Sequence, residues 1–106
     1  MIDLNKKLQL QQLDKKLENF KLVSEIEIPP KGWINAIRKT LNMSLAQLGK
    51  LLKKTPQSVK EIEEREQNKS ITLKGLIEVA AALNLRFVYG FVQLSYLPIF
   101  PSKTCN

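Results

Sequence analysis

Three helix-start signals divide the middle of this chain into short pieces. Ser44 is followed three places later by Gln47, which is the pattern of a capping box. Thr55 is followed by Pro56, and proline suits the first turn of a helix. Thr72 supplies a third N-cap signal. The signals therefore predict several short helices rather than one long helix, and any core must form where those helices meet.

Apolar residues recur at spacings of three and four around these signals, as expected for amphipathic helices. The spacing predicts one helix over residues 33–41 and further helices after Ser44, Thr55 and Thr72. Asn42, the pair at 68–69 and Asn84 are the expected stops. The side chains expected to point inward are Trp33, Ile34, Ile37, Leu41, Leu45, Leu48, Leu51, Leu52, Val59, Ile62, Leu76, Ile77, Val79, Ala80 and Leu83.

The two ends of the chain predict additional elements. Residues 3–20 carry a leucine stripe typical of an amphipathic helix, and Pro29 and Pro30 forbid a helix through that point. Residues 23–28 fit a short strand or an extended linker. Residues 85–97 begin with aromatic and β-branched side chains, which favour a strand. We therefore divide the chain into residues 1–31 (helix and linker), 32–84 (helical domain), 85–97 (strand) and 98–106 (loose tail).

One strand cannot satisfy its own backbone hydrogen bonds. The predicted strand must pair with residues 23–28, with its copy in a second subunit, or with an edge of another protein. We expect a homodimer that uses the N-terminal helix, the strand, or both. The residues expected at the dimer or partner contact are Leu13, Leu17, Phe20, Phe87, Tyr89 and Phe91.

Composition argues against several classes of function. The chain has no histidine, and Cys105 is its only cysteine, so neither an intrachain disulfide nor a Cys/His metal site is expected. Four glycines form no phosphate-cradling loop, so we expect no cofactor and no enzymatic activity. The N-terminus lacks the apolar run of a secretory signal, and residues 85–100 are too interrupted to span a bilayer. A cytoplasmic protein is expected.

The positive charge is concentrated in one region. The formal net charge is +7, yet residues 1–27 balance five lysines with five acids. From Ile28 to Lys60 there is no acid, and seven cations fall in this stretch: Lys31, Arg38, Lys39, Lys50, Lys53, Lys54 and Lys60. Such a surface favours a polyanionic partner, and it coincides with the first two short helices and the turn that follows them.

Two of the short helices meet at residues 53–55, with the small residue Gly49 inside the first of them. This arrangement is typical of a helix-turn-helix. The stretch "MSLAQLGKLLKKTPQSVKEIEE" resembles the Cro/repressor, or XRE, class of such proteins. "PPKGWINAIRKTLNMSLAQL" and "SITLKGLIEVAAALNLRFVYGFV" resemble the mobile mystery protein A family. The resemblance implies a mainly α, lambda-repressor-like helix-turn-helix bundle with an extra N-terminal helix and one C-terminal β-strand.

The resemblance also implies roles for individual residues in binding double-stranded DNA. The base-contacting residues would be Gln57, Lys60 and Glu61, and the phosphate-contacting residues would be Ser44, Gln47, Lys53, Lys54, Thr55 and Ser58. Arg38 and Glu63 would form a structural ion pair behind the reading face, while Glu66 would be solvated. The chain departs from the pattern at three positions. Relatives carry a glutamine at the position of Leu45, a glycine in the turn at the position of Lys54, and a polar residue that contacts bases at the position of Pro56.

The same resemblance implies a role beside a second protein. Members of the family resemble antitoxins paired with a Fic-domain toxin, so the expected function is a repressor that controls its own operon. The alternative is an antitoxin that binds its Fic-domain partner directly, with weak or no specific DNA reading. Fic inhibitory helices carry a Ser/Thr-x-x-x-Glu-Gly/Asn pattern. Residues 14–19, "DKKLEN", match this pattern only at Glu18 and Asn19.

Overall fold

The protein is mainly helical. The computed structural model describes residues 3–92, which contain helices but no strand. These residues divide into two units: residues 28–88, and residues 3–27 together with 89–92. None of the helices within residues 3–92 combines the length and the apolar character needed to cross a bilayer. The all-α part of the predicted fold is therefore confirmed.

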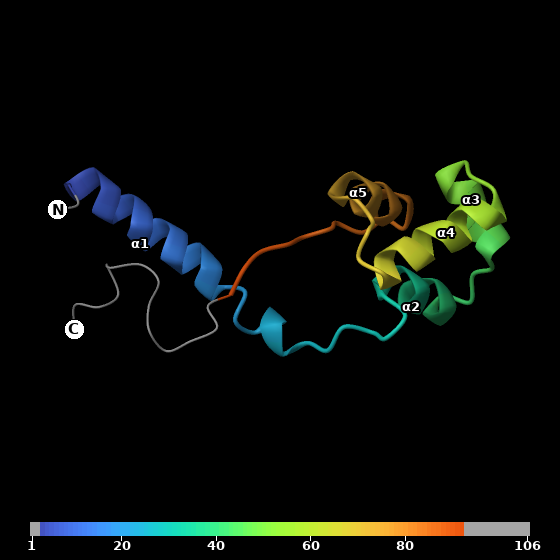
Figure 1. Ribbon diagram of the computed structural model, residues 1–106, viewed down its shortest axis with the longest axis horizontal. Coiled ribbons are helices and arrows are strands. Elements are labelled where there is room, and N and C mark those ends of the chain that lie inside the picture. Colours follow the sequence, from blue (N-terminus) through green and yellow to red (C-terminus); the bar gives the residue numbers. More distant parts are fainter. Residues whose placement is uncertain (1–2, 93–106) are drawn as a thin grey trace. The chain divides into compact units, whose positions relative to one another are not determined.

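Residues 28–88 form a bundle of four helices (Figure 1). In chain order these are α2 (Trp33–Thr40), α3 (Leu45–Leu52), α4 (Pro56–Gln67) and α5 (Leu73–Ala82). Helix α4 packs against α3 and α2, and α3 also packs against α5. Each helix contributes one buried apolar residue to a common core, namely Ile34, Leu48, Val59 and Val79, of which Leu48 and Val59 are fully buried. Burying a side chain of this size contributes about 1.5–3 kcal/mol, so the centre of the bundle is its main stabilising feature.

The predicted caps begin three of these helices. The Ser44 hydroxyl accepts a hydrogen bond from the N–H of Gln47 at 3.0 Å, and the Gln47 side chain accepts one from the N–H of Ser44 at 2.7 Å. The hydroxyl of Thr55 accepts from the N–H of Ser58 at 3.1 Å. That of Thr72 caps α5 in the same way. Each cap contributes about 1 kcal/mol and fixes where a short helix starts.

A residue in the left-handed conformation follows each helix of the bundle. The four residues are Asn42, Lys53, Lys69 and Asn84, with φ between 56° and 64°. The predicted stops are thus confirmed. At the turn before α4, however, the left-handed residue is Lys53, whereas the sequence pattern placed the missing turn glycine at Lys54. The N–H of Lys54 instead donates to the carbonyl of Gly49 at 2.8 Å, which closes the end of α3.

Gly49 lets the turn approach α3 closely. A Cβ atom on this residue would lie 2.6 Å from the carbonyl oxygen of Lys54, a distance that the backbone could relieve only by moving. The buried Gly49 therefore sets how near the chain returns to α3 before α4 begins. Together with Leu48 and Val59, it fixes how α3 meets α4.

Four of the side chains expected inside the bundle are exposed. They are Trp33 (43%), Leu41 (57%), Leu51 (51%) and Ile77 (52%). Helices of 8 to 12 residues around a small core bury only the centre of each apolar stripe, and these four residues lie at helix ends or at the edge of a stripe. The sequence prediction was wrong here because it gave each helix too wide a buried face.

The other unit contains helix α1 (Leu4–Glu18) and the 3-10 turn η1 (Val23–Glu25). Asp3 caps α1 by accepting a hydrogen bond from the N–H of Lys6 at 2.7 Å. The predicted helix is thus confirmed, but η1 replaces part of the strand or linker expected at residues 23–28. The buried residue of α1 is Asp14, rather than one of the leucines of the predicted stripe. The leucines of α1 divide, with Leu13 exposed and Leu17 half-buried.

The C-terminal strand is not confirmed. Residues 85–92 have no regular secondary structure, and residues 93–97 and the tail at 98–106 lie outside the described part of the chain. A strand needs a neighbouring strand for its N–H and C=O groups, and residues 23–28 form η1 and a non-strand segment instead of an edge. Strand propensity at these residues therefore does not produce a strand between residues 85 and 92.

Candidate nucleic-acid interface

Helix α4 carries an exposed polar face. Gln57, Lys60, Glu61 and Glu64 are all exposed and are spaced by three or four residues, which places them on one side of the helix. The three residues predicted to contact bases belong to this face. Amide, ammonium and carboxylate groups together offer donors and acceptors to a base edge, so the face has the chemistry needed for reading a major groove.

One acid on this face has a positively charged neighbour. The guanidinium of Arg65 lies 4.0 Å from the carboxylate of Glu61, one turn earlier on α4. Both side chains are about half exposed, so the pair contributes little to stability. Its effect is local, because a positive group beside Glu61 reduces the negative potential that an approaching phosphate would meet.

The residues predicted to contact phosphate lie at two helix starts and at the turn between them. Ser44 and Gln47 form the capping box of α3, which uses the amide oxygen of Gln47 and leaves its NH₂ group to donate to a phosphate. Thr55 and Ser58 lie at the start of α4, where the Thr55 hydroxyl donates to that of Ser58 at 3.0 Å. The two lysines of the turn, Lys53 and Lys54, are exposed.

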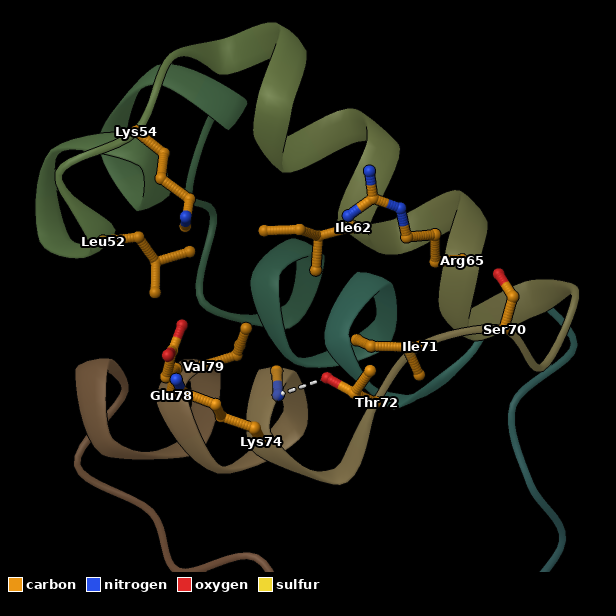
Figure 2. A pocket seen from close by; sticks show the side chains of 11 residues that line it. Leu52, Lys54, Ile62, Arg65, Ser70, Ile71, Thr72, Lys74, Glu78 and Val79 are labelled. Carbon is orange, nitrogen blue, oxygen red and sulfur yellow. Dashed lines mark hydrogen bonds between the residues drawn. The ribbon is translucent and has the colours of Figure 1, made fainter.

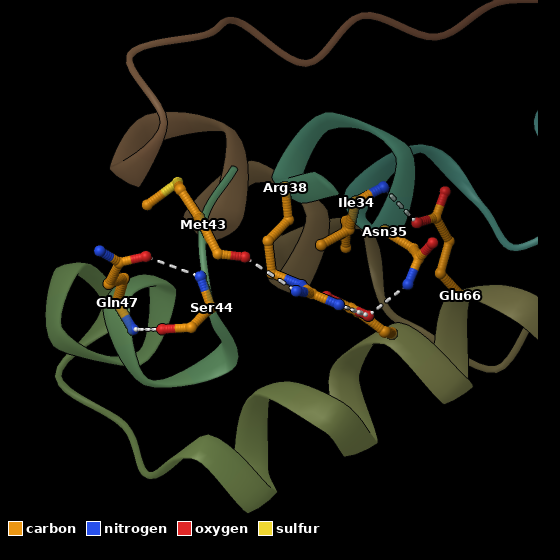
Figure 3. Close-up of polar contacts among 8 residues, drawn as sticks. Ile34, Asn35, Arg38, Met43, Ser44, Gln47 and Glu66 are labelled. Atoms are coloured by element: carbon orange, nitrogen blue, oxygen red, sulfur yellow. Dashed lines mark hydrogen bonds and ion pairs between the residues drawn. The ribbon is translucent and has the colours of Figure 1, made fainter. Parts of the chain in front are cut away.

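Behind the exposed face, Arg38 of α2 and Glu63 of α4 form the predicted ion pair (Figure 3). The Arg38 Nε donates to one oxygen of Glu63 at 2.5 Å, and Nη2 donates to the other at 3.2 Å. A third guanidinium nitrogen donates to the carbonyl of Met43 at 2.9 Å, and the Asn35 amide donates to Glu63 at 2.8 Å. The side chains of Arg38 and Glu63 are only 11% and 6% exposed. The pair therefore ties α4 to α2, with little of either side chain exposed to solvent.

The surroundings of this pair shift both of its pKa values. Burial acts to raise the pKa of Glu63, but hydrogen bonds from Arg38 and Asn35, together with the positive charges of Arg38 and Lys39, outweigh it and lower the pKa. The hydrogen bond to Glu63 raises the pKa of Arg38 despite the opposing effect of burial. Both groups are therefore charged at neutral pH.

Glu66 makes a second link between α4 and α2, and the expectation that it is solvated was wrong. Its carboxylate accepts a hydrogen bond from the backbone N–H of Trp33 at 2.8 Å. It accepts a second from the backbone N–H of Ile34 at 2.9 Å (Figure 3). The N-cap of α2 is Gly32, which has no side chain to accept them. A carboxylate at a helix N-terminus also interacts favourably with the helix dipole. Glu66 thus serves as the cap of α2 from 32 residues away.

A groove of about 480 Å³ lies on another side of α4, between α4 and α5 (Figure 2). Its apolar lining is Leu52, Ile62, Ile71 and Val79. Its charged lining is three cations and one acid, namely Lys54, Arg65, Lys74 and Glu78. An apolar floor with a positive rim is suited to an amphipathic anion rather than to a purely polar ligand.

The residues predicted for dimer or partner contacts are not all exposed. Leu13, Tyr89 and Phe91 are exposed, whereas Leu17, Phe20 and Phe87 are half-buried. The ring of Phe20 lies against Gly90, where a Cβ atom would approach it to 2.5 Å. Phe20 therefore packs within its own unit. Among residues 3–92, no group of three or more His, Cys, Asp or Glu side chains is arranged so that it could bind a metal ion.

Comparison with models of known protein families, with curated proteins and with solved structures gave no match to this chain.

Proposed function

We propose that residues 32–84 are a lambda-repressor-like helix-turn-helix domain that binds double-stranded DNA. Helices α3 and α4 would be the two helices of the motif, with α4 entering the major groove. The observation that carries the proposal is the close turn at Gly49, which joins the two helices and leaves the polar face of α4 exposed. The acid-free stretch from Ile28 to Lys60 supplies cations beside that face.

Within this proposal, Gln57, Lys60 and Glu61 read base edges, and the turn lysines with the cap residues contact phosphates. A glutamine can pair with adenine through two hydrogen bonds, and a glutamate can accept from the amino group of cytosine. Glu61 would then contribute selectivity at the expense of affinity, because it repels phosphates and rejects bases that offer no donor.

At the level of the organism, we propose that the protein is a repressor of its own operon and the antitoxin of a Fic-type toxin. The resemblance of its sequence to the mobile mystery protein A family supports this role. A dimer would bind two half-sites about one DNA turn apart, as helix-turn-helix proteins do. Its subunits would associate through α1, through the segment at residues 85–97, or through both.

The test is a fluorescence-anisotropy titration of the full chain with duplex DNA from the region upstream of its gene. Gln57→Ala should reduce the preference for this duplex over a scrambled one, by about 1–3 kcal/mol. Lys53→Ala should weaken binding to both duplexes equally and reduce the salt dependence by about one released counterion. If both variants bind the upstream duplex with wild-type affinity, the proposed role of this face is wrong.

A second candidate function is direct binding of a protein partner, and the groove between α4 and α5 favours it. Its apolar floor and positive rim match an acidic amphipathic segment, which could come from the Fic-domain toxin. Co-expression with a Fic-domain protein from the same operon should then yield a stable complex. Lys74→Glu on the rim should weaken that complex, whereas Lys69→Glu, the same change outside the groove lining, should not. Equal behaviour of the two variants would exclude the groove.

A further inference from the structure

A second hollow, of about 310 Å³, lies between α2 and α4. We call it the α2–α4 hollow, and it is lined by Lys31, Asn35, Arg38, Lys39, Leu45, Lys60, Glu63, Glu64 and Gln67. Its α4 residues lie at positions 60, 63, 64 and 67, along one flank of the helix. The groove described above borders α4 at positions 62 and 65, which a rotation of 100° per residue places on the opposite flank.

The charges lining this hollow do not cancel. Arg38 and Glu63 are paired with each other, so they add no net charge. Of the remaining residues, Lys31, Lys39 and Lys60 are exposed cations, and Glu64 is the exposed acid. Three positive charges against one negative charge leave the hollow with a net charge of +2.

The chemistry of the lining favours a small, strongly hydrated anion. Among the described residues that line the hollow, Leu45 is the aliphatic one and the others are charged or carry an amide. Lysine ammonium groups sit on flexible stems and bind phosphate as point charges, without the fixed geometry that a planar ligand requires. The phosphodiester group fits this description, whereas an apolar ligand would have almost no apolar surface to contact.

The position of the hollow beside α4 identifies the source of that phosphate. Lys60 and Glu64 belong both to the hollow and to the exposed face of α4. A helix about 10–12 Å across fills a major groove about 12 Å wide, so a sugar–phosphate strand runs along its flank. If the exposed face of α4 contacts bases, the strand on this flank passes the α2–α4 hollow.

We propose that the α2–α4 hollow holds the phosphate backbone of one DNA strand. Lys31, just before α2, and Lys39, in its last turn, neutralise phosphates, while Lys60, which is assigned to a base edge, adds a positive charge to the same hollow. Neither Lys31 nor Lys39 belongs to the turn or the helix starts that the sequence pattern assigned to phosphate contact. The inference rests on the proposed DNA-binding function and extends the interface from the α3–α4 pair to α2.

The test compares two double variants that remove the same charge. One is Lys31→Gln with Lys39→Gln in the hollow, and the control is Lys15→Gln with Lys16→Gln in α1. Both pairs of lysines are exposed, so circular dichroism should match the wild type, and urea unfolding at neutral pH should show only the small loss of the Lys39 charge near Glu63. The full chain is titrated with the upstream duplex by fluorescence anisotropy between about 50 and 200 mM salt, where counterion release dominates the salt dependence.

The hollow variant should reduce the slope of log K against log[salt] by about 2, with an affinity loss of about 10-fold or more at low salt and unchanged preference between duplexes. The α1 control should change the slope by much less. If the two variants behave alike while the wild type binds DNA, the hollow does not hold phosphate and the proposed function still stands. If the wild type binds no duplex, the proposed function fails and this inference falls with it.

Discussion

Removing Arg38 should destabilise the helical bundle more than any loss of surface charge. The perturbation is Arg38→Met, which keeps an unbranched chain but takes the guanidinium away from Glu63 and from the carbonyl of Met43. Glu63 would keep only the hydrogen bond from Asn35, and its side chain is 6% exposed. Leaving one partner of a buried pair without the other costs about 3–5 kcal/mol.

This cost is large beside the stability of so small a bundle. Residues 28–88 should be stable by only about 3–9 kcal/mol, taking roughly 0.05–0.15 kcal/mol per residue. Arg38→Met should therefore be mostly or wholly unfolded in mild urea at pH 7, as measured by circular dichroism at 222 nm. Arg38→Met combined with Glu63→Leu should recover most of the loss, because a well-packed apolar pair avoids the unpaired charge.

The pH dependence of the free energy of unfolding tests the same reasoning independently. In the wild type the folded-state pKa of Glu63 is lowered, so its stabilising effect is present above the unfolded value of about 4.5 and is lost as the pH falls further. In Arg38→Met the burial of Glu63 remains while its main hydrogen-bond donor is gone, so its folded pKa should rise. That variant should therefore become more stable as the pH falls from 7 towards 5.

Glu63→Gln provides a milder check if Arg38→Met does not fold. It keeps the shape of the side chain and its hydrogen bond from Asn35, and its amide oxygen can still accept from Arg38. It should cost at least about 1.5–3 kcal/mol through the lost charge-assisted bond, and up to about 3–5 kcal/mol because the Arg38 charge stays buried without its counterion. It should also remove the part of the acid sensitivity that Glu63 causes. The reasoning would be refuted if the free energies of unfolding of Arg38→Met and Glu63→Gln both lay within about 0.5 kcal/mol of the wild-type value, because changes that small are typical of surface positions.

Two further substitutions test how the helix ends are held. Lys53→Gly should raise the free energy of unfolding by up to about 1 kcal/mol, because glycine adopts the left-handed conformation at φ 57° without a Cβ clash. The same substitution should lower DNA affinity, because it removes a positive charge. Urea unfolding measures the first effect, and the anisotropy titration described above measures the second. Glu66→Ala should lower the free energy of unfolding by about 1–2 kcal/mol, because the N–H groups of Trp33 and Ile34 lose their acceptor. Trp33 fluorescence during urea unfolding should report the change. An unfolding midpoint equal to that of the wild type would show that water replaces the carboxylate at no cost.

The helix boundaries of the bundle were predictable because their signals are local. Ser44, Thr55 and Thr72 each bond to a backbone N–H three residues later, so sequence and structure are linked over less than one helical turn. Asn42 and Asn84 likewise end their helices by their own left-handed conformation. Nothing distant in the chain is needed to fix these positions.

The role of Glu66 was missed because its partners lie far away in the sequence. The carboxylate meets Trp33 and Ile34 only after α4 has packed on α2. One local signal did exist: α2 begins after Gly32, which offers no side-chain acceptor, so another acceptor must serve the first N–H groups of α2. The predicted strand is the converse case, since its residues have strand propensity while its pairing partner is a matter of tertiary structure or assembly.

The four acids of α4 are less opposed to DNA binding than their number suggests. Glu63 and Glu66 are bound to α2, one through Arg38 and one through the backbone at its N-terminus. These two contacts are three residues apart on α4 and reach different parts of α2, so together they restrain both the position and the rotation of α4 relative to α2. The rotation of α4 about its own axis determines which of its residues are exposed. A helix that contacts bases needs this orientation fixed before it binds DNA. Two acids on α4 therefore help to orient its exposed face, and only Glu61 and Glu64 remain where they would oppose a phosphate.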